Sequence, residues 1–287
     1  MAAPSLRAIP HRSVKTRRIG FSYPSDGLDR HFVKGDLVMS HIVAMLSAMF
    51  PEGEDFFVRS VRRGQQYVTD PELAAQVAGF IGQEVTHGRE HRALNERLAQ
   101  MGYPTRMVDR AVHYGMVWRD KVMPMRFNLA VTAALEHYTA TIAERLLRSP
   151  EAQELLGESE VRSMLLWHAL EESEHKSVAF DVFQAAGGSE RQRIWTFRMV
   201  STLFLLAIIG STTVSLLRDR ATYNPVRLGR SLAQLRHSPF LSRSVIRNLR
   251  AYNRVGFHPD DMDATDLLDR WRAELFGTEG VLTDHLK

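Results

Sequence analysis

The sequence contains no cysteine among its 287 residues. Disulfides, thiolate zinc sites, iron-sulfur clusters and cysteine nucleophiles are therefore excluded. Any chemistry has to come from carboxylate, imidazole and hydroxyl groups. A strong excess of one charge is also lacking, since 37 lysines and arginines face 33 aspartates and glutamates, a formal net charge of +4. This balance is too mild to indicate nucleic-acid binding, so we expect no nucleic-acid partner.

The first twenty residues lack the apolar run of a secretory signal, although several of them are basic. We therefore expect a basic, flexible N-terminal arm over residues 1–30. The same observation favours a cytoplasmic location.

One long uncharged run does occur, and it covers the nineteen residues from Met199 to Leu217. This length is just sufficient to span a membrane. The run contains six serines and threonines, and the sequence has no second apolar run of this length. Both observations favour a buried helix or one that lies in the membrane interface. The arginine-rich stretch from Arg227 to Arg254 is typical of basic amphipathic helices. These helices form either a solvated face or a peripheral contact with anionic lipid at the inner face of the membrane.

The central body of the sequence is helical by its pattern. From His31 to Gly187 the apolar residues recur at intervals of three and four, and no run alternates over the length of a strand. Turn residues divide this body into four segments at about 31–62 (broken at Pro51), 72–101, 125–147 and 160–186. We predict an all-α fold in which residues 31–190 form a four-helix bundle. Residues 191–287 are predicted to add C-terminal helices packed on the bundle, including the apolar helix 199–217.

Two of the four segments carry polar side chains in their apolar, inward-facing positions. Each group of three falls within a narrow sector, about 60° wide at about 100° per residue for the first group. All members of a group therefore point at the same place inside the bundle. The groups are Glu84, His87 and His91 in the second segment, and His168, Glu172 and His175 in the fourth.

The other two segments offer one carboxylate each. Glu136 lies among the apolar positions of the third segment. The first segment offers Glu52 or Glu54, and we favour Glu54. If a helix begins after Pro51, Glu52 lies in its first turn, where a carboxylate also serves the helix dipole.

Several neighbouring residues lie beside this pattern. His91 and His168 lie one turn from the Glu-x-x-His pairs, so each is either a third nitrogen ligand or a hydrogen-bonded neighbour of the ligands. His137 lies about 100° round its helix from the apolar seam and is predicted to be structural. Glu171 and Glu174 are predicted to face away from the seam and to be solvated.

Four carboxylates cannot be buried together without compensation, because an isolated buried charge costs several kcal/mol and like charges repel. Two metal ions would neutralise them, with glutamates bridging the ions and imidazoles completing the coordination. A Glu-x-x-His pair on each of two helices, with one glutamate on each of the other two, is the ligand plan of ferritin-like dinuclear sites. One such pair is expected roughly once by chance in this composition, but two in separate seams are not. The alternative is a buried network of salt bridges and hydrogen bonds.

With these motifs the chain resembles a bacterial family of predicted metal-dependent hydrolases that is placed among the ferritin-like proteins. The resemblance runs from about His31 to Asp260 and implies a ferritin-like bundle. The segments that carry it are 50–57, 80–87 with His91 and Asn95, 136–137, 167–168 together with 171–176, and 256–259.

The spacing in the fourth segment is also similar to that of the p-aminobenzoate N-oxygenase group, in which an additional histidine joins the di-iron site. This second resemblance is confined to ligand spacing and leaves His91 unmatched. Asn95 and Asp181 either orient the ligands or lie at the surface or in helix caps, and we favour the surface or capping role. The metal ligands that the resemblance implies are Glu54, Glu84, His87, Glu136, His168, Glu172 and His175.

Carboxylate-rich sites with few histidines suit iron or manganese. The expected cofactor is therefore two metal ions, with iron favoured over manganese or zinc. The leading functional prediction is a di-iron oxidase or oxygenase that acts on a small or lipid-like organic substrate with an electron donor. The first alternative is a metal-dependent hydrolase in which a metal-bridging hydroxide attacks the substrate. The second is a non-catalytic iron-binding bundle.

Overall fold

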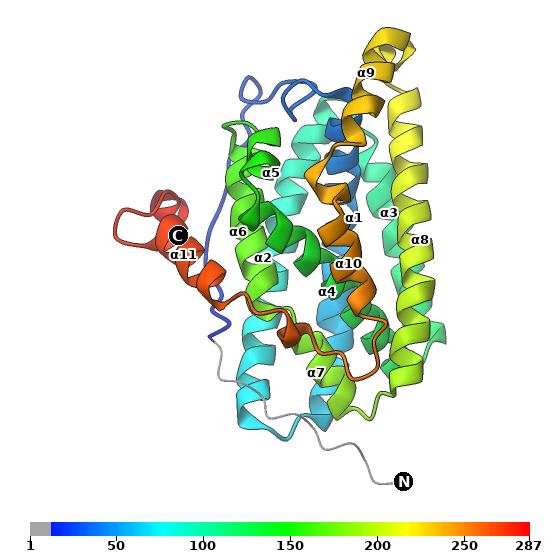
Figure 1. The fold of residues 1–287 in the computed structure, drawn as a ribbon, viewed down its shortest axis with the longest axis vertical. Helices are drawn as coiled ribbons and strands as arrows, with labels where there is room; N and C mark the ends of the chain where they lie inside the picture. Colours follow the sequence, from blue (N-terminus) through cyan, green and yellow to red (C-terminus); the bar gives the residue numbers. More distant parts are fainter. Residues whose placement is uncertain (1–12) are drawn as a thin grey trace.

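The structure is a computed structural model that describes residues 13–287, and these residues form an all-α fold (Figure 1). Within them, β structure is limited to one isolated bridge between Ile19 and Leu286. The predicted all-α helical bundle is therefore confirmed. The four helices of the bundle are α1 (Leu37–Gly64), α2 (Pro71–Gln100), α4 (Met125–Arg148) and α6 (Glu160–His175).

Short polar side chains fix where the bundle helices begin. The Asp36 carboxylate accepts a hydrogen bond from the Met39 amide at the start of α1. The Asp70 carboxylate accepts two amide hydrogen bonds at the start of α2, where Pro71 occupies the first turn. Ser159 caps α6 in the same manner. Each cap satisfies amides that have no partner inside the helix, which favours helix formation from that residue onward.

Helix α1 runs through Pro51 without interruption, so the predicted break at this residue is wrong. Proline has no N–H, and the carbonyl four residues earlier, that of Ser47, therefore lacks its helical partner. The Asn95 side chain of α2 donates a hydrogen bond to this carbonyl at 2.8 Å. A contact between helices thus replaces the missing bond, and the continuous helix carries Glu54 into the interior.

Two further elements depart from the predicted segments. Helix α3 (Thr105–Val122) occupies a stretch for which no helix was predicted, and it packs against α1. The fourth predicted segment is two helices, α6 and α7 (Val178–Ala185), separated at residues 176–177. At this break the Lys176 ammonium is buried and donates to the Glu144 carboxylate at 2.8 Å. This buried ion pair fixes the chain at the joint immediately after His175.

The apolar core is divided into two clusters along the bundle. One cluster includes residues 44–48 of α1, 94–98 of α2, 143–147 of α4 and 161–170 of α6. The other includes residues 56–61 of α1, 73–80 of α2, 129–138 of α4 and 178–183 of α7. All four bundle helices therefore place their polar, inward-facing residues in one layer between two apolar clusters.

The described part of the N-terminal segment is not a flexible arm. Ile19 is fully buried, and the Arg17 guanidinium inserts between carboxylates of α6, where it lies 2.9 Å from Glu171 and 2.8 Å from Glu174. These ion pairs hold residues 13–30 against the bundle, which corrects the prediction for this part. The rest of the predicted arm, residues 1–12, lies outside the described residues.

The apolar helix α8 (Glu190–Leu217) lies along one side of the bundle (Figure 1). It is long and apolar enough to cross a membrane, yet only 17% of its most apolar window is buried. Of the two expectations, the buried helix is therefore wrong for most of its length, and the helix in the membrane interface stays a prediction. One face packs on the bundle through Phe197 and Val200, while the opposite face exposes side chains such as Leu206 and Ile209. The C-terminal helices are α9 (Pro225–Leu235), α10 (Arg243–Ala251) and α11 (Thr265–Phe276), and the short helix α5 (Pro150–Leu155) joins α4 to α6.

Candidate metal centre

The polar layer between the two apolar clusters brings the predicted ligands together. The eight side chains are at most 4% exposed. Subsets of them that combine carboxylate oxygens and imidazole nitrogens lie within 4.8 Å of one another, a spacing that allows a shared metal ion. The residues are Glu54 from α1, Glu84, His87 and His91 from α2, Glu136 from α4, and His168, Glu172 and His175 from α6.

Glu172 stands at the centre of this cluster. Its Oε1 atom lies 3.0 Å from His168 Nε2, 3.5 Å from His87 Nδ1 and 3.6 Å from His175 Nε2. One carboxylate oxygen thus faces three imidazole nitrogens from two helices. This is the place expected for a glutamate that is shared between two ions.

The remaining carboxylates approach the same imidazoles from the other helices. His175 Nε2 lies 3.0 Å from Glu84 Oε1 and 3.3 Å from Glu136 Oε2. His168 Nε2 lies 3.7 Å from Glu54 Oε1. All four helices therefore contribute a carboxylate to the layer, as the sequence pattern predicted.

The structure places Glu54, and not Glu52, at the centre of the bundle, as we predicted. Glu54 is 1% exposed and belongs to the cluster. Glu52 points outward, where its carboxylate lies 2.7 Å from the imidazole of His113. Because α1 continues through Pro51, however, Glu52 does not stand at a helix start, so the reason that we gave for the choice does not apply.

Glu171 and Glu174 are buried, and the prediction that both are solvated is wrong. The Glu171 carboxylate accepts a hydrogen bond from His87 Nε2 at 3.0 Å, and its other oxygen pairs with Arg17. Because a carboxylate only accepts, the proton of neutral His87 sits on Nε2. The lone pair of Nδ1 then faces the cluster.

Gln83 orients His175 in the same manner. Its side-chain nitrogen donates to Glu174 at 2.9 Å, which fixes the orientation of the amide, and its oxygen then accepts from His175 Nδ1 at 2.9 Å. The proton of neutral His175 therefore sits on Nδ1, and the lone pair of Nε2 faces the carboxylates.

A chain of hydrogen bonds that begins at Pro51 fixes the third imidazole. Asn95 donates to the Ser47 carbonyl, so its oxygen accepts from the Ser47 hydroxyl at 2.8 Å. Ser47 has then used its only proton and accepts from His91 Nδ1 at 2.9 Å. His91 Nε2 consequently accepts from His168 Nδ1 at 2.8 Å.

This chain decides between the two roles that were predicted for His91 and His168. Both nitrogens of His91 are used within the chain, which favours a positioning role. His168 presents the lone pair of Nε2 to Glu172 and Glu54, which favours metal ligation. Asn95 contributes to this orientation, so the expectation of a surface or capping role for it is wrong.

The polar groups at the centre fit a pair of metal ions and do not satisfy one another. When the imidazoles are neutral and the carboxylates are ionised, as metal binding requires, three lone-pair nitrogens face carboxylate oxygens, which also only accept. No lysine or arginine within residues 13–287 pairs with Glu54, Glu84, Glu136 or Glu172. The buried atoms without a hydrogen-bond partner are both carboxylate oxygens of Glu54, Glu84 and Glu136, Oε2 of Glu172, Nδ1 of His87 and Nε2 of His175.

The pKa shifts show that the cluster retains protons when no metal is bound. Burial, reinforced by the neighbouring carboxylates, raises the pKa of Glu54 well above its usual value and that of Glu136 to about 8. Burial lowers the pKa of His168 to about 4. Burial also opposes a proton on His87 and on His175, but Glu171 and Glu172 raise the pKa of His87 to about 10, and Glu136 and Glu172 raise that of His175. These two imidazoles therefore retain protons in the absence of metal, and metal ions would displace them. A site that retains protons on its acids attracts metal cations, which neutralise several carboxylates at once.

A family model described as predicted metal-dependent hydrolase matches residues 15–263 of the chain. The chain belongs to this family. The match covers all four bundle helices and confirms the predicted family. No curated protein and no solved structure matches the chain. The family description and the buried histidine and glutamate clusters together support metal dependence.

The sequence pattern missed the residues that orient the imidazoles. His137 is structural as predicted, since it is buried and its Nε2 donates to the Asn248 carbonyl at 3.0 Å. Glu171 and Gln83, in contrast, gave no periodic signal because they lie at the edge of the apolar seam. Local sequence offers no signal for them: residues 166–175 of α6 are buried on every face, and only the contacts of the folded chain show this.

Proposed function

We propose that this chain is a metal-dependent hydrolase that works through a dinuclear centre on a lipophilic substrate. The family description supports the reaction class. The unpartnered lone pairs of the central cluster support the metal centre. Bound metals would polarise the substrate and lower the pKa of water. The residues that would hold them are Glu54, Glu84, His87, Glu136, His168, Glu172 and His175.

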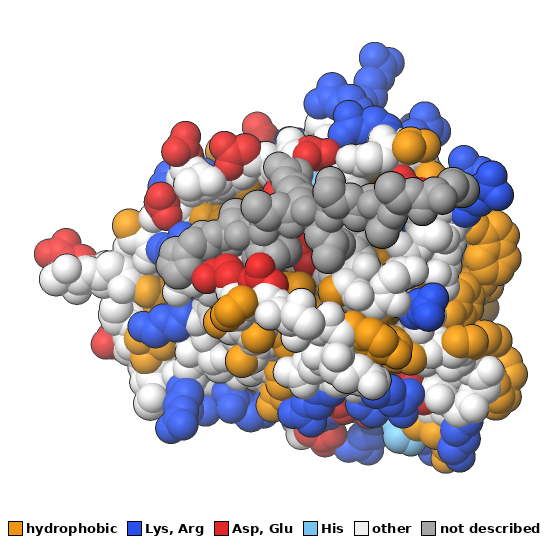
Figure 2. Space-filling view, turned by 90° about the horizontal axis from the view of Figure 1, so that it is seen from below, with side chains coloured by type: hydrophobic (Ala, Val, Ile, Leu, Met, Phe, Trp, Pro, Cys, Tyr) orange, Lys and Arg blue, Asp and Glu red, His pale blue; other side chains and the backbone are white. Residues whose placement is uncertain are grey.

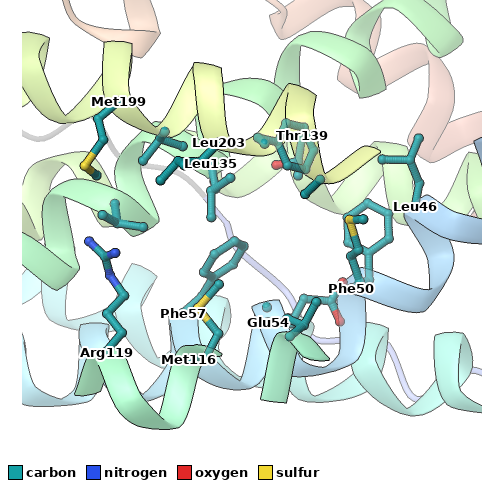
Figure 3. Close-up of a pocket in the computed structure, with 17 residues that line it drawn as sticks. Leu46, Phe50, Glu54, Phe57, Met116, Arg119, Leu135, Thr139, Met199 and Leu203 are labelled. Carbon is teal, nitrogen blue, oxygen red and sulfur yellow. The ribbon is translucent and has the colours of Figure 1, made fainter. Parts of the chain in front are cut away.

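The observation that carries the choice of substrate is a cavity of about 230 Å³ that reaches Glu54 (Figure 3). It lies among α1, α3, α4 and α8, and its lining is almost entirely apolar, as illustrated by Phe57, Met116 and Leu203. Its volume is somewhat below the roughly 300–1,000 Å³ of drug-sized ligand sites. A small aliphatic substrate therefore suits the cavity better than a bulky or polar one.

A di-iron oxidase or oxygenase is the second candidate, and the same cavity favours it. Hydrolysis needs a proton donor for the leaving group, whereas the polar side chains in the lining are limited to Glu54, Arg119 and Thr139. A ligand set of four glutamates with few histidines also suits iron or manganese. Bound iron would activate dioxygen in a site from which water is largely excluded.

One experiment separates the two reaction classes. The purified protein is loaded in turn with zinc, manganese and iron, and the hydrolysis of p-nitrophenyl octanoate is followed together with oxygen consumption by the reduced iron form. Metal-dependent ester cleavage that is lost in Glu84→Ala supports the hydrolase. Oxygen consumption in excess of the bound iron, without ester cleavage, supports the oxygenase. Absence of both in a metal-loaded protein contradicts both proposals and leaves a non-catalytic metal-binding bundle.

We also propose that the protein meets anionic lipid from the cytoplasmic side through α8. Hydrophobic side chains gather along the edge of the molecule where α8 lies, with lysine and arginine side chains beside them (Figure 2). The exposed residues Leu205, Leu206 and Ile209 supply apolar contact, and the basic helices α9 and α10 supply attraction to anionic head groups. Equal sedimentation with neutral vesicles and with vesicles that contain phosphatidylserine would contradict this proposal.

A further inference from the structure

Arg119 is the one basic side chain that lines the apolar cavity. Its Nε and Nη2 atoms are inaccessible to solvent and have no hydrogen-bond partner among the described residues. Arg119 is partly buried as a residue, but buried N–H groups of a guanidinium that lack acceptors are costly, because their desolvation is not compensated. The ring of Phe127, 4.8 Å from the guanidinium carbon, compensates only part of this cost.

The neighbouring carboxylate of Asp120 accepts from other residues and makes no hydrogen bond with the Nε or Nη2 atom of Arg119. Asp120 pairs with Arg59 at 2.7 Å and with Arg63 at 3.4 Å. It also accepts a hydrogen bond from Asn128 at 3.3 Å. The protein thus supplies acceptors for two arginines beside the cavity and leaves the third, inside it, without one. Burial correspondingly lowers the pKa of Arg119.

Arg119 and Glu54 are separated along the cavity. Figure 3 shows Arg119 at one end, with Phe57 and Met116 between it and Glu54. Asp120, the neighbour of Arg119, pairs with Arg59 and Arg63 of α1. These two residues follow Glu54 by five and nine positions, which corresponds to about 7–14 Å along the helix. An aliphatic chain of medium length covers this span.

We propose that the cavity binds a single-chain aliphatic carboxylate, with its carboxylate on Arg119 and its chain directed towards Glu54. Two free N–H groups of one guanidinium match the two oxygens of a carboxylate. A phosphate carries about −1.5 to −2 charges and would call for a second cation, which the lining lacks.

The consequence for the reaction rests on the function proposed above. The carboxylate is held away from the metal centre, so the group that reacts lies along the chain near Glu54. For hydrolysis, the corresponding substrate class is the half-ester of a medium-chain dicarboxylic acid. The outer side of α8, whose inner side lines the cavity through Met199 and Leu203, exposes an apolar surface from which such an amphiphile can be taken up.

Calorimetric titration of the purified full-length protein with octanoate and with 1-octanol tests the binding site. We expect octanoate to bind more tightly than octanol. Arg119→Met should weaken octanoate binding about 10- to 100-fold, the usual value of a hydrogen-bonded charge pair, and should change octanol binding little. Arg110→Met, an exposed arginine of the same helix, is the matched control and should bind both ligands as the native protein does.

Arg119→Lys keeps a positive charge and should retain the preference for octanoate, which makes the test independent of whether the methionine variant folds. Equal binding of octanoate and octanol to the native protein, or an unchanged octanoate affinity in a folded Arg119→Met, would overturn the proposal. Octanoate binding by Glu84→Ala separates the two proposals, because it needs Arg119 and not the metal centre. If that variant binds octanoate while the metal-loaded native protein has no activity, the proposed function fails and the carboxylate site stands.

Discussion

Among residues 13–287, two clusters of histidine and carboxylate side chains have the spacing of a metal site, and the central one alone combines this spacing with an excess of carboxylates. The other cluster consists of His31, His41 and Asp219, whose side-chain atoms also lie within 4.8 Å of one another. Residue types and spacing therefore do not distinguish the two. The difference lies in the charges and hydrogen-bond partners around them.

The Asp219 cluster is satisfied by the protein itself. The Arg30 guanidinium donates to Asp219 through two nitrogens at 3.2 and 3.1 Å, and both imidazoles contact the same carboxylate oxygen. Ser215 contacts the remaining nitrogen of His41, and Arg227 that of His31. The cluster thus combines one carboxylate with two arginines, Arg30 on Asp219 and Arg227 on His31, so it has no excess of negative charge to attract a cation. It ties the end of α8 to the start of α1.

The central cluster has the opposite balance, because its four carboxylates meet only imidazoles and pair with no lysine or arginine among residues 13–287. The distance between possible ligand atoms therefore identifies both clusters, whereas the number of carboxylates without a cationic partner identifies the central one alone. The following predictions use this contrast.

The largest expected effect is the loss of metal from the central cluster. Glu84→Ala and Glu172→Ala should each reduce the bound metal from about two ions per chain to near none, because each removes a carboxylate that faces both imidazole-bearing helices. Elemental analysis by mass spectrometry measures the content. Asp219→Asn is the control and should retain the native content. If Asp219→Asn alone lost its metal, the metal would lie at the Asp219 cluster, and the assignment to the central cluster would be contradicted.

A smaller effect is expected from the hydrogen-bond chain that orients His168. Asn95→Ala removes the partner of Ser47, so the proton positions of His91 and His168 are no longer fixed. Metal affinity, measured by competition with a chelator, should fall about 10- to 100-fold. Ser60→Ala, which removes another buried hydroxyl of α1, should leave the affinity unchanged. Equal affinities in all three proteins would show that the chain does not tune the site.

The Asp219 cluster should contribute stability and not metal binding. Asp219→Asn removes the charge that Arg30 and both histidines share, and should lower the free energy of unfolding by about 1.5–3 kcal/mol. Urea denaturation measures this difference. Asp269→Asn, at an exposed ion pair with Arg272, should change it by less than about 1 kcal/mol. A native unfolding free energy in Asp219→Asn would contradict the structural role.

The smallest effect concerns the pH dependence of the Asp219 cluster. Burial lowers the pKa of His41 to about 4, against about 6.5 in the unfolded chain. The stability that neutral His41 contributes is therefore complete above about pH 6.5 and is lost as the pH falls towards 4. His41→Gln should remove on the order of 1 kcal/mol of this pH dependence, which urea midpoints across the range would reveal. Parallel curves for the two proteins would contradict the assignment.

The sequence predicted the bundle and the inward-facing residues because both follow from helical periodicity. Glu84, His87, His168 and the other candidates needed only the angle between residues on one helix. The break at Pro51 was wrong because the bond that compensates for it comes from Asn95, 44 residues later. Helix periodicity contains no information about such contacts.

The same limit explains the misplacement of Glu171 and Glu174. Each faces away from the apolar seam, and their burial depends on Arg17, about 154 and 157 residues away in the sequence. The exposed face of α8 was missed for a related reason, since an apolar run does not show how much of it the rest of the chain covers. Contacts between distant segments, and not local pattern, decide all three cases.

The most direct test of the central claim is the metal content of the native protein, purified without added metal or chelator and measured together with the protein concentration. The central cluster predicts about two iron, manganese or zinc ions per chain. A folded protein that contains no bound metal, and that takes up none on incubation with these ions, would contradict the account.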